Sequence, residues 1–391
     1  MRSSAFLYPW DVLGDPAAPD RLAALGVRAV TLASAYHSAR ALTPRHPVTR
    51  VVTAPHAAVY YPASAGRWSG HDLRPYQQEW LPGGDPWGEA ARALAEAGLE
   101  VASWVVLAHN SRLGDDFPLS SVCNAYGDRY PWALCVARPE VVRYCTELAV
   151  EAGVRPGASG TELESCGWYG MAHLHAHDKI GGVPLDGAAQ YLMSLCFCDV
   201  CSAAYADAGA PELDAAVRAA LAPVWRGEVP PAVYASGTDE WSAIEGLLGA
   251  DLARLTLDYR AERARSLQRS CVGAVREAAG PGFRVFLHAD PAPHRLGANA
   301  GVTVEGLDGL VDGLVLPCSG PGSVRDTFAA VAKAAPGVLR AANLTMVSGM
   351  GGAPSRLAVP EADELRLYHA GLASDADLAE LGRQLAALAQ D

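Results

Sequence analysis

Short apolar runs alternate along the chain with longer alanine- and leucine-rich runs whose apolar positions recur at helical spacing. The first kind has the length and composition of a buried strand, and the second kind has the period of an amphipathic helix. The alternation occurs eight times and therefore predicts eight strands. These are Ala5–Tyr8, Arg28–Ser34, Glu100–Leu107, Gly157–Leu163, Arg284–His288, Gly313–Pro317, Val338–Leu344 and Leu365–Ala370.

Helical runs fill most of the gaps between these strands. Such alternation is typical of parallel strands joined by right-handed crossovers. Eight units predict an α/β protein with a (β/α)8 TIM barrel, and an open doubly wound sheet is the alternative. No Gly-x-Gly-x-x-Gly follows an early strand, which disfavours a dinucleotide-binding fold. The predicted helices are Pro19–Leu25, Pro86–Ala97, Arg138–Ala152, Ala188–Ala206, Leu247–Ala279, Val324–Ala334 and Ala376–Ala389.

The connections after strands 2, 3 and 4 are long loop insertions. We expect one barrel domain over residues 1–391, with an insertion at about 165–280 between the fourth and fifth strands. Loops that follow the carboxyl ends of barrel strands build the active-site face. The connection from Ala35 to Gly98 is rich in tyrosine, tryptophan and histidine. Aromatic loops at that face suit sugars, whose C–H faces stack on rings.

Composition narrows the class of partner and the location. Half of the residues are hydrophobic, the net charge is −12, and nine cysteines are present. An acidic chain is a poor match for nucleic acid or an anionic membrane surface, so we expect neither partner. With no signal peptide or transmembrane run, the predicted location is cytoplasmic. Cysteines there are more plausibly reduced, buried or metal-bound than paired.

Carboxylates near the ends of predicted strands are the candidate catalytic groups. Glu162 and Glu164 are two residues apart, so on a strand both point the same way. Two close carboxylates repel each other and raise one pKa, which favours one acid and one base near neutral pH. Asp290 directly follows the fifth strand and is the best second carboxylate. We therefore predict Glu162, Glu164 and Asp290 as catalytic residues, as glycosidic bond cleavage needs a carboxylate pair.

Polar side chains after other strands are candidate hydroxyl-binding groups. The segment from His173 to Asp178 is dense in donors, and its three histidines could instead ligate a metal if the chain were extended there. A solvated surface loop is the simpler alternative for that segment. The predicted substrate-binding residues are His37, His109, Asn110, Asn124, His177, Asp178, His288 and Tyr368.

Three thiols lie within six residues at Cys196, Cys198 and Cys201. Thiolates at Cys-x-Cys-x-x-Cys spacing can converge on one soft cation, and Zn²⁺ is the expected metal. A buried, metal-free cluster is the alternative, because free cysteine packs readily as a small hydrophobe. No sequence feature indicates an organic cofactor.

At these residues the chain resembles the glycoside hydrolase superfamily of (β/α)8 barrels, in particular family 42 β-galactosidases and related uncharacterised glycosidase-like proteins. The resemblance implies that Glu164 or Glu162 is the general acid and that Cys196, Cys198 and Cys201 bind a structural zinc. It places the fourth ligand on Cys135, with Cys123 as the competitor. The family nucleophile ends strand seven, whereas the run from Leu339 to Gly349 here contains no acid.

The sequence thus predicts a glycoside hydrolase that cleaves a small glycoside or oligosaccharide by carboxylate acid/base catalysis. The missing acid on strand seven keeps open a non-catalytic sugar-binding barrel. The segment from His173 to Asp178 keeps open a metal-dependent hydrolase or isomerase. The expected partner is a small carbohydrate, and the oligomeric state is open between a monomer and a homo-oligomer.

Overall fold

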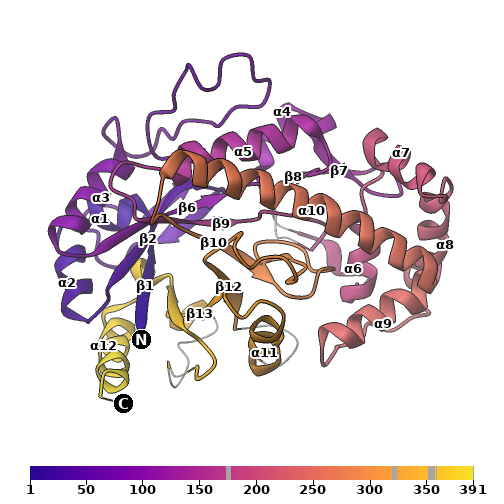
Figure 1. Ribbon diagram of the computed structural model, residues 1–391. Helices are drawn as coiled ribbons and strands as arrows, with labels where there is room; N and C mark the ends of the chain where they lie inside the picture. Colours follow the sequence, from indigo (N-terminus) through magenta and orange to yellow (C-terminus); the bar gives the residue numbers. More distant parts are fainter. Residues whose placement is uncertain (173–177, 319–323, 351–356, 358, 391) are drawn as a thin grey trace.

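The computed structural model describes residues 1–172, 178–318, 324–350, 357 and 359–390 (Figure 1). Eight parallel strands form a closed ring, because the first strand along the chain pairs with both the last and the second. The fold is therefore a TIM barrel, and all eight predicted strands are confirmed. In pairing order the strands are β1 (Arg2–Leu7), β14 (Glu364–Tyr368), β13 (Leu339–Thr345), β12 (Gly313–Pro317), β10 (Arg284–Asp290), β9 (Gly160–Glu164), β6 (Glu100–Val106) and β2 (Ala29–Tyr36).

The strands are buried on both faces. Every residue of β2 and of β9 is buried, as expected where helices cover the outer face of a parallel sheet and side chains fill the interior. Because all eight strands run the same way, their carboxyl ends lie together at one end, the barrel mouth. Their amino ends form the opposite end, the barrel floor.

Helices cover much of the outer surface of the barrel. The Asp85 side chain caps α3 by accepting the amide of Gly88, and prolines open α3 and α5. No helix of the described residues is long and apolar enough to cross a membrane. The outer helices are α1 (Pro9–Leu13), α2 (Ala18–Ala24), α3 (Pro86–Glu96), α5 (Pro139–Gly153), α11 (Val324–Ala334) and α12 (Asp375–Leu388).

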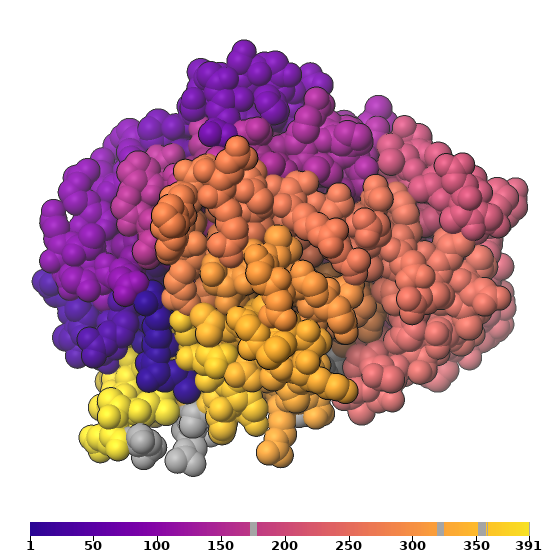
Figure 2. Space-filling view, viewed as in Figure 1, coloured from indigo at the N-terminus to yellow at the C-terminus, as the bar shows by residue number. Residues whose placement is uncertain are grey.

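The connection between β9 and β10 forms a lobe on one side of the barrel, visible at the right of Figures 1 and 2. The predicted helix Ala188–Ala206 is in fact two helices, separated by the segment that contains Cys196 and Cys198. The long last helix of the lobe returns across the barrel and packs against α5 (Figure 1). The lobe helices are α6 (Gly187–Met193), α7 (Asp199–Asp207), α8 (Leu213–Trp225), α9 (Gly237–Leu248) and α10 (Ala250–Ala279).

The remaining connections carry short elements. The connection from β10 to β12 is fully described and contains no helix, only the short strand β11 (Ala300–Gly301). After β2 and β6 the chain forms the hairpins β3–β4 and β7–β8. The short elements are β3 (Ala39–Leu42), β4 (Val51–Ala54), β5 (Ala58–Val59), α4 (Ser111–Asp116), β7 (Ser121–Cys123), β8 (Arg129–Leu134) and the 3₁₀ turns Pro118–Ser120, Ile180–Gly182, Ser348–Met350 and Ala370–Leu372.

Candidate active site

Two glutamates of β9 point into the barrel, one above the other. Glu162 and Glu164 are two residues apart on an extended strand, so their side chains lie on the same face. Both are almost fully buried, with 2% and 4% of their surface exposed. Glu164 ends the strand at the barrel mouth, and Glu162 lies one layer deeper. The two carboxylates contact different neighbours, and their pKa values shift in opposite directions.

Glu162 is held as a carboxylate by a buried cation. Its Oε1 lies 2.5 Å from Nε of Arg366 on β14 and accepts the hydroxyl of Thr31 at 3.1 Å, while its Oε2 lies 3.1 Å from Nε2 of His288. Burial alone would raise the pKa of Glu162, but the Arg366 guanidinium and the His288 hydrogen bond outweigh it and lower that pKa to about 2. Glu162 is therefore expected to be ionised near neutral pH.

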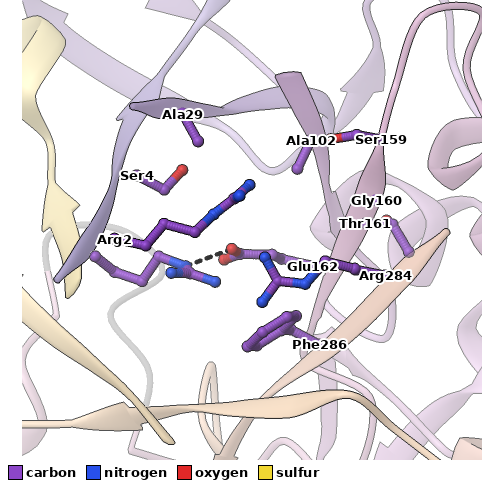
Figure 3. Close-up of a pocket in the computed structure, with 11 residues that line it drawn as sticks. Arg2, Ser4, Ala29, Ala102, Ser159, Gly160, Thr161, Glu162, Arg284 and Phe286 are labelled. Atoms are coloured by element: carbon purple, nitrogen blue, oxygen red, sulfur yellow. Dashed lines mark hydrogen bonds and ion pairs between the residues drawn. The ribbon is translucent and has the colours of Figure 1, made fainter. Parts of the chain in front are cut away.

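The ion pair belongs to a group of charged side chains at the barrel floor, and Figure 3 shows Arg2, Glu162 and Arg284 of this group. Glu364 pairs with Arg284 at 2.5 Å and with Arg366 at 3.0 Å. This charged floor borders a cavity of about 20 Å³, which has room for about one water molecule. The cavity is too small for a sugar. The charged floor consists of Arg2, Glu162, Arg284, Glu364 and Arg366.

Glu162→Gln should destabilise the fold by roughly 3 kcal/mol, because removing one partner leaves the other charge buried and undercompensated. Urea unfolding followed by circular dichroism measures this change in the free energy of unfolding. Glu228→Gln is the matched control, since it breaks a pair with Arg226 on the exposed surface and should leave the unfolding midpoint unchanged. Equal midpoints for Glu162→Gln and wild type would contradict the structural role of the pair.

His288 connects the two glutamates. It lies on β10 with its ring 3% exposed, and its Nε2 contacts Glu162 while its Nδ1 lies 3.8 Å from Oε2 of Glu164. The two ring nitrogens thus face different carboxyl groups, and this predicted substrate-binding residue lies between Glu162 and Glu164.

No arginine or lysine among the described residues pairs with Glu164, unlike Glu162. Burial raises the pKa of Glu164 above the ordinary value, although His288 and a hydrogen bond from Nε1 of Trp104 at 2.8 Å oppose that rise. The phenols of Tyr36, Tyr169 and Tyr368 face the same carboxyl group and carry no positive charge. Two carboxyl groups one layer apart thus have opposite pKa shifts, which is the pattern of a permanent base and a protonated acid.

Aromatic rings surround Glu164 at the barrel mouth. Trp104 lies 4.5 Å from Tyr36 and 6.2 Å from Tyr368 between ring centroids, and Tyr8 stacks on His369 at 5.3 Å. Burial lowers the pKa of His369 to about 3, so this ring is neutral. Among the described residues, the surroundings of Glu164 are therefore mainly aromatic, with Glu162 and His288 below.

The backbone turns sharply after Glu164. Ser165 has φ of 58°, and it is the one non-glycine residue with positive φ in the part of the chain that the structure describes. Its amide bonds to the carbonyl of Ala298 and its carbonyl accepts the amide of Ala108. Left-handed backbone at a non-glycine residue costs about 1 kcal/mol or more and persists where neighbours enforce it, often beside functional groups. These bonds hold the end of β9, and with it the Glu164 carboxyl, in place.

Asp290 ends β10, on the same face of the strand as His288. One carboxylate oxygen accepts the amide of Ala292 at 2.8 Å and the other lies 3.9 Å from Nε of Arg295. Burial raises the pKa of Asp290, opposed by these two contacts. Asp290 thus lies at the barrel mouth on the strand next to β9, and its catalytic role stays a prediction.

Three other predicted binding residues lie around the mouth. His37 follows β2 and its ring lies 4.9 Å from that of His109, which stacks on Tyr169 at 4.6 Å. Tyr368 ends β14 and contacts the Trp104 ring and the Glu164 carboxyl group. The structure thus brings these three side chains together with Glu164 through shared aromatic neighbours.

The two predicted asparagines have local partners. Asn110 caps α4 by accepting the amide of Leu113, and Asn124 bonds within the turn between β7 and β8. The structure does not bring either amide into contact with Glu162 or Glu164. His173, His175 and His177 lie outside the described residues, and Asp178 directly follows them. Substrate binding by all of these residues stays a prediction.

Four cysteines form a separate buried cluster. Sγ of Cys135 lies 3.7 Å from that of Cys196, 3.8 Å from that of Cys198 and 3.7 Å from that of Cys201. All four sulfur atoms lie within 4.8 Å of one another. Four thiolates at about 2.3 Å from a tetrahedral Zn²⁺ would be about 3.8 Å apart. The cluster can therefore hold a metal ion, and Cys135 rather than Cys123 is its fourth member among the described residues.

Sequence reasoning missed two of the groups that define this site. Arg366 was part of a predicted strand without any assigned role, and an arginine in a strand buried on both faces is the signal that could have identified it. Trp104 lies in the predicted strand Glu100–Leu107 without any assigned role; it is fully buried and donates to Glu164. Neither side chain can be linked to β9 without knowing which strands are neighbours across the barrel.

Comparison with known proteins identifies the fold class. No protein-family model matches the sequence, and no curated protein matches it either. Solved structures of glycoside hydrolases do match. The catalytic domain of a β-amylase from Paenibacillus polymyxa aligns with a TM-score of 0.56 at 13% identity, over 100% of this chain and 99% of that one. The chain thus shares the (β/α)8 barrel fold of this enzyme.

Two larger enzymes show the same likeness. A β-galactosidase from the psychrophilic Marinomonas ef1 gives a TM-score of 0.53 at 14% identity, over 100% of this chain and 59% of that one. An α-L-fucosidase isoenzyme 2 from Paenibacillus thiaminolyticus gives 0.51 at 14% identity, over 100% and 49%. The chain thus spans about half to three fifths of the length of these two. At such identities the likeness concerns the fold alone.

Proposed function

We propose that the protein is a glycoside hydrolase that uses Glu164 as its general acid. The observation that carries the proposal is the buried, raised-pKa carboxyl of Glu164 at the mouth of a glycosidase-type barrel, one layer above the ionised Glu162. A general acid must carry its proton near the working pH, and burial favours the neutral form of a carboxyl group. Aromatic rings around Glu164 suit the C–H faces of a sugar.

The chemistry follows from these properties. Glu164 would donate its proton to the glycosidic oxygen as the bond to the anomeric carbon breaks. Positive charge then develops on the sugar ring, and a nearby carboxylate stabilises it or activates water. Glu162 would act from below: its contact with Nε2 of His288 holds that ring beside Glu164. In this reading Glu162 is a positioning residue.

Asp290 is the proposed second carboxylate. It lies at the mouth on the strand adjacent to β9 and is the nearest acid in sequence to His288. The strand that carries the nucleophile in family 42, here β13, contains no acid. A separation of about 5 Å between the two carboxyl groups would predict retention of anomeric configuration, and about 6.5–9.5 Å would predict inversion.

A panel of aryl glycosides tests the proposal. We expect wild-type turnover on at least one sugar and a loss of about 10³-fold in kcat for Asp290→Asn, because the second carboxylate takes part in bond cleavage. Asp20→Asn on the surface of α2 is the matched control and should keep wild-type rates. Proton NMR of the first product distinguishes retention from inversion. Full activity of Asp290→Asn would exclude Asp290 from the chemistry and leave the assignment of Glu164 intact.

A non-catalytic sugar-binding barrel is the second candidate function. The lack of any acid along β13 favours it, because a barrel that has lost one catalytic carboxylate still binds sugar at its aromatic mouth. The two functions differ in one result. Saturable sugar binding by calorimetry without turnover on any glycoside would favour the binding protein.

The cysteine cluster is proposed to hold a structural Zn²⁺. The sulfur separations fit a tetrahedral thiolate site, and four protein ligands leave no open position for a substrate. Cys135 precedes α5, and the other three thiols lie at the junction of α6 and α7. The ion would therefore fasten the lobe to the barrel. The predicted cytoplasmic location would keep these thiols reduced.

A further inference from the structure

A cleft of about 460 Å³ opens beside the candidate active site, between the lobe and the barrel. Its walls are the start of α9, the side of α10, the chain that follows β10, and α11. In Figure 1, α9 and α11 lie on the same side of the molecule, below the β10–β12 strands. A volume of this size is within the range of about 300–1,000 Å³ of small-molecule sites. Its lining includes Thr238, Trp241, Asp290, His294, Arg295 and Ala330.

The cleft adjoins the barrel mouth at Asp290. That side chain lines the cleft and lies on the same face of β10 as His288, which contacts Glu164. A ligand in the cleft would therefore extend from the barrel mouth along the lobe.

The chemistry of the lining favours a neutral polar ligand with an apolar face. Two guanidinium groups, of Arg254 and Arg295, are balanced by two carboxylates, of Asp290 and Asp326. A site with such a balance does not select a phosphate or a uronic acid. Trp241 contributes an indole ring, the side-chain type on which sugar rings stack. Hydroxyl groups of Ser236 and Thr238 add donors.

Buried contacts fix the walls before any ligand binds. Glu240 of α9 is 4% exposed and lies 3.4 Å from Nε2 of His294, and it also pairs with Arg295. These contacts join the lobe to the loop that follows β10. Trp241 packs edge-on against Tyr191 and donates its Nε1 proton to Glu245 at 2.9 Å. A preformed site loses less free energy to ordering when it binds.

We propose that this cleft binds a further neutral sugar unit of the substrate, so that the enzyme prefers an oligosaccharide to a simple glycoside. This proposal rests on the proposed function, because its main test measures hydrolysis. The cleft itself is a binding site separate from Glu164, the proposed general acid. The added unit would lie between the Trp241 ring and α11. The cleft thus sets chain-length preference, while Glu164 and Asp290 carry out bond cleavage.

Filling the cleft tests the proposal without removing any contact. Ala330 is an exposed residue of α11 that lines the cleft, and its neighbour Ala329 is equally exposed and does not. Ala330→Trp should lower kcat/KM about tenfold or more on the aryl glycoside of a trisaccharide and leave the aryl monoglycoside unchanged. Ala329→Trp should match wild type on both. Trp241→Ala should repeat the Ala330→Trp pattern, with the exposed Trp225→Ala as its control.

The outcomes separate this proposal from the proposed function. Equal rates for Ala330→Trp and wild type on the trisaccharide, or equal losses on both substrates, would overturn the cleft site while hydrolysis stands. If wild type hydrolyses nothing, the same variants are compared by calorimetry with free trisaccharides. Binding that Ala330→Trp weakens and Ala329→Trp retains would then support the cleft and reject hydrolysis. If Ala330→Trp binds free trisaccharides as tightly as wild type does, the proposed sugar site in the cleft is wrong.

Discussion

Glu164→Gln should lower kcat about 10²- to 10⁴-fold on glycosides with poor leaving groups, the range that a positioned general acid contributes. Glutamine has nearly the shape of the protonated acid and can still accept from Nε1 of Trp104, so the fold should persist. Activated aryl glycosides, whose leaving oxygen needs no proton, should be hydrolysed almost normally. The measurement is the ratio of rates on a 2,4-dinitrophenyl glycoside and on the corresponding alkyl glycoside.

The pH profile gives an independent check on Glu164. The protonated form is the active one, so kcat/KM should fall as pH rises through the raised pKa of Glu164. This basic limb should disappear in Glu164→Gln. Glu151→Gln, a buried glutamate away from the barrel mouth that accepts from Trp68 and Tyr61, is the control and should keep the limb. Equal losses on activated and unactivated substrates would rule out the acid role.

Cys135→Ser should abolish metal binding and destabilise the fold by several kcal/mol. Structural Zn²⁺ sites bind with apparent free energies of about 10–16 kcal/mol, and part of that is free energy of folding. Sγ of Cys135 contacts the other three sulfur atoms, so its loss removes one of the four ligands of the proposed tetrahedral site. Inductively coupled plasma mass spectrometry gives the zinc content, expected to fall from one equivalent to none. Thermal unfolding measures the loss of stability.

Cys318→Ser is the control for this experiment. Cys318 lies outside the four-thiol cluster and is only partly buried, so its substitution should keep one zinc and the wild-type melting temperature. A strong chelator should lower the melting temperature of wild type while activity at low temperature persists, because the proposed ion does no chemistry. Wild-type protein without metal, or Cys135→Ser that retains one equivalent, would reject the zinc site.

The barrel could be predicted because its parallel strands are buried on both faces and therefore occur in the sequence as short, continuous apolar runs. These runs are distinct from the helices between them, whose apolar residues recur every three to four positions. β1, β10 and β12 have this signature and were placed to within a few residues. The predicted helix Ala188–Ala206 was wrong in its middle. The segment between α6 and α7 has neither glycine nor proline to signal a break, and the helix ends where Cys196 and Cys198 turn toward Cys135.

The part of the candidate site that depends on the residues of one strand could be predicted from the sequence. The spacing of Glu162 and Glu164 places both on the inner face of β9, and that inference needs no other strand. The spacing does not show which of the two meets a cation, since Arg366 follows Glu162 by 204 residues. The fourth cysteine of the thiol cluster, Cys135 or Cys123, likewise cannot be chosen from spacing. Both precede α5, and only the folded chain shows which sulfur meets the other three.

The charged floor also bears on how the protein is made. Glu162 leaves the ribosome well before Arg366, and at about 5–20 residues per second the interval is about 10–40 s. Until Arg366 is made, the Glu162 carboxylate lacks the cation that pairs with it in the barrel interior. The ring of strands also cannot close, because β14 links β13 to β1. Until β14 is made, one edge of β1 and one edge of β13 therefore lack their partner. Expression yield should depend on chaperone supply during translation more than on the stability of the finished barrel.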